Sequence, residues 1–207
     1  MITWTKKFLA SAAAVLLLVA VGAGQVSAQD DHPAQVVVET AVKNMLAFLA
    51  ANIDEAKADR TLLEAKVDEV IVPNIDFVAM TRLSVGKNWR KADEAQQKEL
   101  VDEFQILLLN AYNSAMIQYG GQEATFEQFR PESRDDRAVV RSAFKAQGSS
   151  DVEVSYKLRE KNGWFIYDIE VAGLSLVNNF RQKFTDEINA NGIEGLLGFL
   201  KKRNSKS

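Results

Sequence analysis

Histidine and cysteine, the side chains that most often carry nucleophilic or metal chemistry, are almost absent from this sequence. His32 is the single histidine, and there is no cysteine among the 207 residues. A zinc site draws on several His or Cys ligands and a Ser-His-Asp triad needs a positioned imidazole, so neither has its partners here. His32 precedes Pro33 near the expected start of the mature chain, where we expect a loose surface residue. The sequence predicts no metal site, no cofactor and no catalytic nucleophile.

Asp168 is the carboxylate with the best claim to a chemical role. It falls within an otherwise apolar run, residues 164–169, where an unpaired charge would be costly. One interpretation is a buried general base of the kind that small cone-shaped α+β enzymes use. The other, which we favour, is a structural role in which Asp168 pairs with a nearby arginine or caps backbone amides. Gly192, Gly195 and Gly198 are too widely spaced for a phosphate-binding loop and follow no strand.

The elements that would position these side chains begin with helices. Apolar residues recur at helical spacing over residues 34–119. The pattern predicts two amphipathic helices before Pro73, a short helix capped by Asp76 and ended by Gly86, and a long helix that begins at Asp93.

Beyond the helices the apolar period changes to two, which is typical of strands. Strand-length runs cover residues 124–129, 137–145, 152–159 and 164–171. The last run is apolar on both faces, as expected for a central strand that is covered on each side. After Gly173 the helical spacing returns in two stretches, the second of which carries residues 193–200. The fold class is therefore α+β: an N-terminal helical part, a curved antiparallel sheet, and C-terminal helices that close over it.

The first 28 residues have the three parts of a secretion signal. Lys6 and Lys7 precede an apolar run at 8–23, and Val26-Ser27-Ala28 ends it. That run is shorter than the about 20 apolar residues that a spanning helix needs. We expect residues 1–28 to be removed and residues 29–207 to form one domain in the periplasm. Its parts would be a mainly helical segment at 29–121, the sheet at 122–173 and the closing helices at 174–203.

Charge and composition limit the partners of the mature chain. The formal charge of −3 becomes −5 when two lysines leave with the signal, which argues against nucleic acid as a partner. A curved sheet backed by helices forms a concave pocket, and such a pocket is the usual ligand site. Patterning alone thus predicts an exported, non-enzymatic α+β protein.

Several short segments also carry a family resemblance. In order along the chain they are PNIDF at 73–77, GKNWR at 86–90, WFIYDI at 164–169, GLSLVNNFR at 173–181 and GIEGL at 192–196. Together they resemble the MlaC family of periplasmic phospholipid-binding proteins, also called toluene-tolerance auxiliary proteins. The resemblance extends over essentially the whole mature chain. Phe180 departs from it, since many relatives have a tyrosine there.

The resemblance implies a monomeric lipid shuttle with a nuclear-transport-factor-like sheet that holds acyl tails against the helical part. It would exchange glycerophospholipid between an outer-membrane lipoprotein complex and an inner-membrane ABC transporter complex with an MCE-domain protein, and so maintain outer-membrane asymmetry. Arg141 and Arg181 are candidates for contact with the headgroup. The candidate tail contacts lie on the apolar faces of the long helix, the sheet and the closing helix: Phe104, Leu107, Leu108, Ala111, Tyr112, Val140, Phe144, Val154, Tyr156, Ile166, Leu174, Val177 and Phe180.

Two alternatives stay open at this point. One is a small periplasmic hydrolase or isomerase that uses Asp168 with Tyr112 or Tyr156 as acid and base. The other is a chaperone or adaptor whose apolar groove takes peptide. Lipid extraction from the purified protein separates all three functions.

Overall fold

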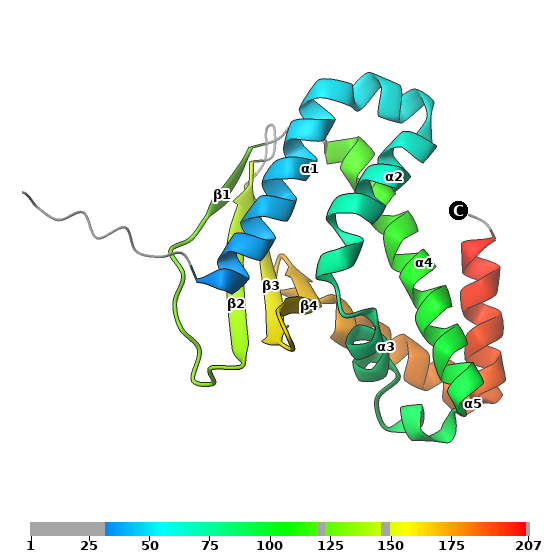
Figure 1. The fold of residues 1–207 in the computed structure, drawn as a ribbon. Helices are drawn as coiled ribbons and strands as arrows, with labels where there is room; N and C mark the ends of the chain where they lie inside the picture. The colour runs from blue at the N-terminus through cyan, green and yellow to red at the C-terminus, as the bar shows by residue number, and fades with distance from the viewer. Residues whose placement is uncertain (1–31, 120–122, 146–149, 206–207) are drawn as a thin grey trace, which may run out of the picture. The chain divides into compact units, whose positions relative to one another are not determined.

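The structure is a computed structural model that describes residues 32–119, 123–145 and 150–205 (Figure 1). The expected signal peptide, residues 1–28, lies outside the described residues.

Two helices open the described chain. Helix α1 (Pro33–Ala58) has a kink at Asn52, where the backbone leaves helical geometry, and Asp59 separates it from α2 (Arg60–Val70). The Asp59 carboxylate accepts a hydrogen bond from the Thr61 N–H at 3.0 Å, which caps α2. The helix pair predicted before Pro73 is therefore confirmed, and the 3-10 turn η1 (Val72–Asn74) follows it.

The predicted ends of the next two helices are also confirmed. Asp76 caps α3 (Phe77–Val85) through its carboxylate, which accepts from the Ala79 N–H at 2.9 Å, and Gly86 ends it with a φ of 64°. The 3-10 turn η2 (Gly86–Lys91) then leads to α4 (Glu94–Tyr119). Asp93 and Gln96 accept hydrogen bonds from each other's backbone N–H at 2.8 and 3.0 Å, which is a capping box.

The sheet is an antiparallel meander with the order β1-β2-β3-β4-β5 in the described residues. Its strands are β1 (Ala124–Phe126), β2 (Arg137–Phe144), β3 (Val152–Glu160), β4 (Trp164–Val171) and β5 (Leu174–Ser175). Four of them lie where the period-two runs predicted, and the two-residue β5 is too short to show a period. The α+β class with a curved antiparallel sheet is confirmed.

A bulge in β4 changes the interpretation of its two apolar faces. The register slips between Lys157 and Leu158, so Ile166 pairs with Leu158 whereas Ile169 pairs with Tyr156. Both isoleucines therefore reach the same cluster on one face of the sheet. The bulge therefore explains why the apolar run of β4 is unbroken, while Asp168, on the other face of the strand, is also buried at 5% exposure.

Helix α5 (Leu176–Asn204) ends the described chain and is bent at Gly192, where φ is 72°. The bend separates two helical stretches, as the sequence predicted. A Cβ on Gly195 would lie 2.1 Å from the Asn191 Cβ, whereas one on Gly198 would meet nothing within 4 Å. The turn at 192–195 therefore needs a glycine, because it brings the backbone too close for a side chain.

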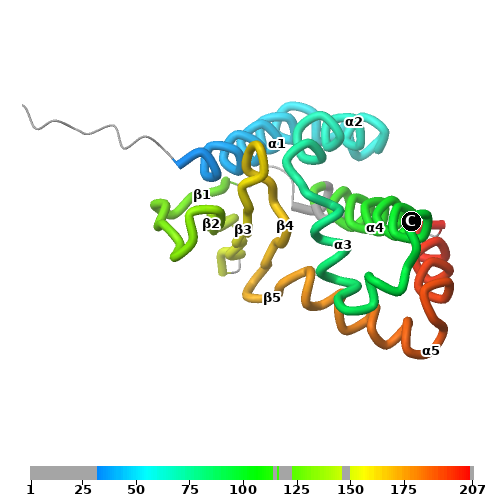
Figure 2. Tube along the Cα trace, turned by 60° about the horizontal axis from the view of Figure 1, so that its bottom comes forward, coloured from blue at the N-terminus to red at the C-terminus, as the bar shows by residue number. Residues whose placement is uncertain are grey.

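The helices and the sheet enclose three apolar clusters. Figures 1 and 2 show α1 on one face of the sheet and α3, α4 and α5 beyond the β4 side of it. The sheet cluster joins the first half of α1 to β2, β3 and β4, with Val38 and Leu158 completely buried. The upper helical cluster joins the second half of α1 to α2 and α4 around Leu49 and Leu63. The lower helical cluster joins α3, α4 and α5 around Phe104 and Phe184.

Helix α1 is long and apolar enough to cross a membrane by length and composition. Its apolar residues, however, include Ala34, Val38, Met45 and Leu49, whose exposure is 1% or less. These contacts account for part of the hydropathy of α1, since 28% of its most apolar stretch is buried in the protein.

Candidate functional site

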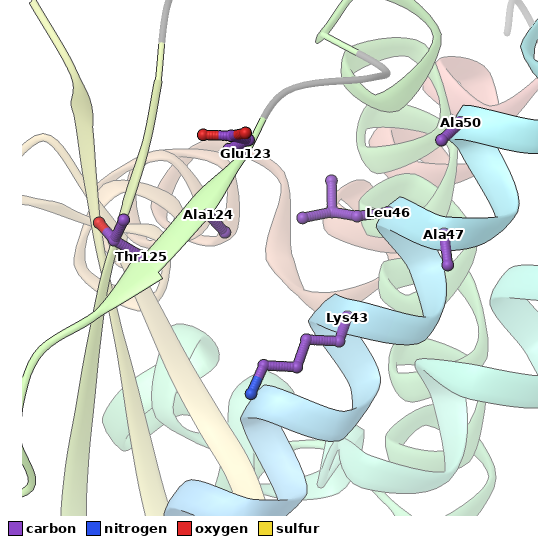
Figure 3. A pocket seen from close by; sticks show the side chains of 7 residues that line it. All are labelled: Lys43, Leu46, Ala47, Ala50, Glu123, Ala124 and Thr125. Carbon is purple, nitrogen blue, oxygen red and sulfur yellow. The ribbon is translucent and has the colours of Figure 1, made fainter.

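A pocket of about 440 Å³ lies between the second half of α1 and strand β1 (Figure 3). Leu46, Ala47 and Ala50 line it from α1, while Ala124 and Thr125 line it from β1. In Figure 3 the Leu46 side chain points from the helix toward Ala124. The wall is mainly apolar and small, because three of its residues are alanines.

Charged side chains complete the lining. Lys43 belongs to α1 and forms an ion pair with Glu39 one helical turn earlier. Glu123 precedes β1 and pairs with Lys145, with the Nζ and Oε2 atoms 3.0 Å apart. All four of these charges are at least partly solvated, so the lining combines an apolar wall with one cation and one carboxylate that water can reach.

The pocket is continuous with the sheet cluster. Leu46 packs against this cluster, and Ala124 pairs in the ladder with Phe144, which packs there as well. Val140, Tyr156 and other residues on the α1-facing side of the sheet form the cluster interior. An apolar chain that entered at the pocket would therefore meet further apolar side chains.

Two tyrosine hydroxyls are buried inside the fold, one in the sheet cluster and one in the upper helical cluster. Tyr156 belongs to the former and Tyr112 of α4 to the latter. Burial raises the pKa of Tyr156 to about 12, although a hydrogen bond with Ser142 opposes the shift. Burial, and then the neighbouring Tyr156, raise the pKa of Tyr112 even further. Both phenols remain neutral at physiological pH, which makes them poor acids and bases.

Asp168 has the structural role that the sequence favoured. Its Oδ1 accepts a hydrogen bond from the Val177 N–H at 3.1 Å, and its Oδ2 accepts one from the Ser175 hydroxyl at 2.7 Å. The cation beside it is Lys157, with Nζ 3.4 Å from Oδ2, and not the arginine that we expected. The carboxylate thus fastens the start of α5 to β4, and these bonds occupy the oxygens that a general base would use.

The predicted site residues divide among all three clusters. Val140, Phe144, Val154, Tyr156 and Ile166 lie together in the sheet cluster. The lower helical cluster contains Phe104, Leu107, Leu108, Val177 and Phe180, and the upper one contains Tyr112. Ala111 and Leu174 are exposed, the latter by 70%, so they do not lie on the buried apolar faces that the pattern indicated. Lipid contact by any of these residues stays a prediction.

The two predicted headgroup arginines lie on other parts of the fold. Arg141 alternates with the buried Val140 and Ser142 along β2, which places it toward the face of the sheet opposite α1. Arg181 is exposed on α5, and its Nε donates a hydrogen bond to the Leu83 carbonyl at 2.9 Å. Neither arginine lines the pocket at α1 and β1.

The expectation that His32 is a loose residue was wrong. Its Nδ1 accepts a hydrogen bond from the Ala34 N–H at 3.2 Å, which caps α1. Its ring stacks on Phe129 with centroids 4.1 Å apart and meets the edge of Trp164 at 5.0 Å. Distant aromatic partners therefore fix this end of the chain, and a local sequence pattern does not show them.

The sequence interpretation missed the residues that line the pocket. Leu46 follows the apolar spacing of an amphipathic helix, and its alanine neighbours carry no distinct signal. A helix face of small residues opposite a strand that begins with Ala124 leaves space unfilled, and this was the available clue. Among the described residues, no group of three His, Asp or Glu side chains could hold a metal ion.

Comparison with known proteins identifies a family and relatives that match most of this chain. Residues 39–202 match the family model described as MlaC protein. The chain is 25% identical over 182 residues to toluene tolerance protein ttg2D of Pseudomonas putida, which covers 86% of this chain and 82% of that protein. It is 20% identical over 166 residues to the intermembrane phospholipid transport system binding protein MlaC of Haemophilus influenzae, with 78% of each chain covered.

A solved structure agrees with these matches. The phospholipid-binding protein from Ralstonia solanacearum, determined in complex with a phospholipid, has a TM-score of 0.78 and 33% sequence identity to this chain. The similarity covers 84% of this chain and 98% of that one. With a family model that matches most of its length and a fold shared with this relative, the chain belongs to the MlaC protein family.

Proposed function

We propose that this protein binds a glycerophospholipid with its acyl tails between the sheet and the helices, and carries it through the periplasm between two membranes. The observation that carries the proposal is the similarity to the Ralstonia solanacearum protein, which was determined with a phospholipid bound. At 33% identity over most of both chains, the two proteins share one fold, which supports a similar use of the space between the sheet and the helices. Binding without chemistry also fits an interior whose Asp168 and tyrosine hydroxyls have structural partners or remain neutral.

The pocket between α1 and β1 supports an entry point for a tail. The pocket volume of 440 Å³ is about 15 times the about 30 Å³ that a liquid water molecule occupies, and a methylene is of similar size, so the open pocket has room for part of one acyl chain. A second chain needs more space, and the sheet cluster beyond Leu46 is where apolar side chains would receive it. The tails would then contact Val140, Phe144, Val154, Tyr156 and Ile166.

The energetic reason for a protein carrier is the cost of exposing the tails to water. At about 0.8 kcal/mol for each buried methylene, two tails of about 16 carbons represent on the order of 20 kcal/mol. An apolar interior removes that cost without any catalytic group. The headgroup would stay at the mouth, where Lys43 is the cation of the pocket lining. Lys43 thus joins Arg141 and Arg181 as a candidate for contact with the phosphate.

We place the working form in the periplasm after removal of residues 1–28. Its partners would be the outer-membrane lipoprotein complex and the inner-membrane ABC transporter complex with its MCE-domain protein, and the protein would travel as a monomer. Because lipid binding in a pocket supplies no energy of its own, the direction of transfer would come from those complexes. Outer-membrane lipid asymmetry would be the result.

Lipid analysis of the purified protein tests the proposal. The mature chain is prepared from the periplasmic fraction without detergent, and its bound molecules are identified by native mass spectrometry. We expect about one glycerophospholipid per chain and uptake of labelled phospholipid from vesicles by the delipidated protein. A protein that carries no lipid and takes up none would contradict the proposal. Bound peptide would favour a chaperone, and turnover of the lipid would favour an enzyme.

A further inference from the structure

A second pocket, of about 340 Å³, lies where the end of α3, the turn η2 and the first turns of α5 meet. Four of its seven lining residues are basic: Arg82, Lys87, Arg90 and Arg181. Leu83, Gly86 and Trp89 complete the lining, which contains no carboxylate. We call this set the basic pocket. It shares no residue with the pocket between α1 and β1.

The charge of the basic pocket is uncompensated. All four basic side chains are exposed, and none of them forms an ion pair with a residue that the structure describes. The whole chain has a formal charge of −3, so four adjacent cations without an acid are a local reversal of its charge. Such a concentration of one sign creates a field that attracts anions.

The fold holds these cations in place. Arg181 Nε donates a hydrogen bond to the Leu83 carbonyl at 2.9 Å, which leaves the remaining guanidinium N–H groups for another acceptor. Trp89 packs against the lower helical cluster and so anchors η2, which carries Lys87 and Arg90. Gly86 turns the backbone at the end of α3. Three segments of the chain are thus fastened around one charged depression.

Exposed apolar side chains accompany the cations. Leu83 lines the basic pocket and is 37% exposed, and Val78, one helical turn before Arg82 on α3, is 53% exposed. Trp89 is partly buried beside them. Arginine and lysine together with exposed Leu and Val and a partly buried Trp form the combination that settles at a membrane interface, where cations meet lipid phosphates and apolar groups enter the headgroup layer.

We infer that the basic pocket and its apolar border are a docking surface for an anionic lipid bilayer. Arg82, Lys87, Arg90 and Arg181 bind headgroup phosphates at the membrane surface, while Leu83 and Val78 contact the outer part of the acyl layer. The surface holds the protein at the membrane and leaves the other pocket free. This inference goes beyond lipid carriage and does not depend on it, because the docking surface shares no residue with the pocket between α1 and β1, and it assigns Arg181 to the membrane surface and not to the carried lipid.

Flotation with lipid vesicles tests the inference. The mature protein is mixed with vesicles of phosphatidylcholine alone, or of phosphatidylcholine with phosphatidylglycerol, and the bound fraction is measured. The test variant is Lys87→Gln with Arg90→Gln. The matched control is Lys57→Gln with Arg60→Gln, which removes the same charge from exposed positions at the junction of α1 and α2. A parallel titration with inorganic phosphate measures recognition of the free anion.

We expect the wild type to bind the anionic vesicles, to prefer them over the neutral ones, and to release them at high salt. Each basic residue near the surface contributes about fivefold to the membrane partition coefficient. The partition coefficient of the test variant should therefore fall at least about tenfold, while that of the control should change by less than about twofold. Both variants should retain co-purified lipid. No binding by the wild type, equal binding to both kinds of vesicle, or equal loss in test variant and control would overturn the inference. So would a surface that binds inorganic phosphate but not vesicles.

Discussion

Filling the pocket between α1 and β1 provides a direct test of where a lipid tail enters. Ala47 lines this pocket from α1, and Ala47→Trp adds nine side-chain heavy atoms to it. The flat indole takes the place of roughly five methylenes of a tail, about a third of what the pocket volume corresponds to. At about 0.8 kcal/mol each this costs about 4 kcal/mol of binding free energy, an upper value near 10³-fold in affinity. We expect at least about a tenfold loss of phospholipid affinity.

The control for this change lies on the same helix. Ala51 is also an exposed alanine of α1 but does not line the pocket, so Ala51→Trp makes the same substitution without filling it. Both variants should unfold at nearly the wild-type temperature when delipidated, because neither forces volume into a close-packed core. Delipidated protein is needed because a bound ligand itself stabilises the fold.

Uptake of labelled phospholipid from vesicles and co-purified lipid per chain measure the effect. Equal lipid content and equal uptake in the two tryptophan variants would refute entry at this pocket, even if the protein proved to be a lipid carrier. A strong loss of stability in Ala47→Trp alone would refute the premise that the side chain enters free space.

The remaining predictions concern the fold around the site. Asp168→Ala leaves two donors at the start of α5 without their acceptor. The free energy of unfolding in urea should fall by about 2 to 5 kcal/mol, and the lipid bound per chain should not change. A change below about 1 kcal/mol would argue against the structural role. Burial alone would raise the pKa of Asp76. The hydrogen bond from the Ala79 N–H and the ion pair with Arg159 outweigh burial and lower the pKa from its usual 3.8. The ionised Asp76 carboxylate therefore stabilises the fold above about pH 4, and this stabilisation is lost as the pH falls through the lower folded-state pKa. On acidification the Tm of Asp76→Asn should fall less than that of the wild type. Parallel Tm profiles would contradict this. Gly195→Ala should destabilise, because its Cβ would lie 2.1 Å from the Asn191 Cβ, whereas Gly198→Ala should stabilise by about 0.5 to 1 kcal/mol in thermal unfolding; similar effects at the two glycines would show that the bend accommodates a side chain.

Local signals determined the helix ends, and these could be predicted. Asp76, Gly86 and Asp93 act through residues within one turn of themselves, so their side-chain types alone indicated a cap, a stop and a start. Asp168 was also interpretable, because a carboxylate in an apolar strand must find donors and the nearest ones in sequence begin the next helix.

Features that depend on distant segments were not visible in the sequence. The stacking of His32 on Phe129 and Trp164 joins residues far apart along the chain. The bulge opposite Lys157 and Leu158 moved Ile166 and Ile169 to one face, which strict alternation could not anticipate. The pocket at α1 and β1 arises because small side chains meet across the fold, and an alanine looks the same in sequence whether it faces a neighbour or a gap.

The attachment of β4 to the helices has a mechanical consequence. The Asp76 N–H donates to the Ile166 carbonyl at 2.8 Å, Ile75 packs against both the sheet cluster and the lower helical cluster, and Asp168 holds the start of α5. Strand β4 is thus the strand of the sheet that is fastened to the helices, and β1 lies three strands away at the opposite edge. With strands about 4.8 Å apart the lever arm is about 14 Å, so a rotation of about 20° displaces β1 by about 5 Å, more than the about 4 Å contact distance between carbon atoms. A small turn at the fastened strand therefore widens the protein most where β1 faces α1.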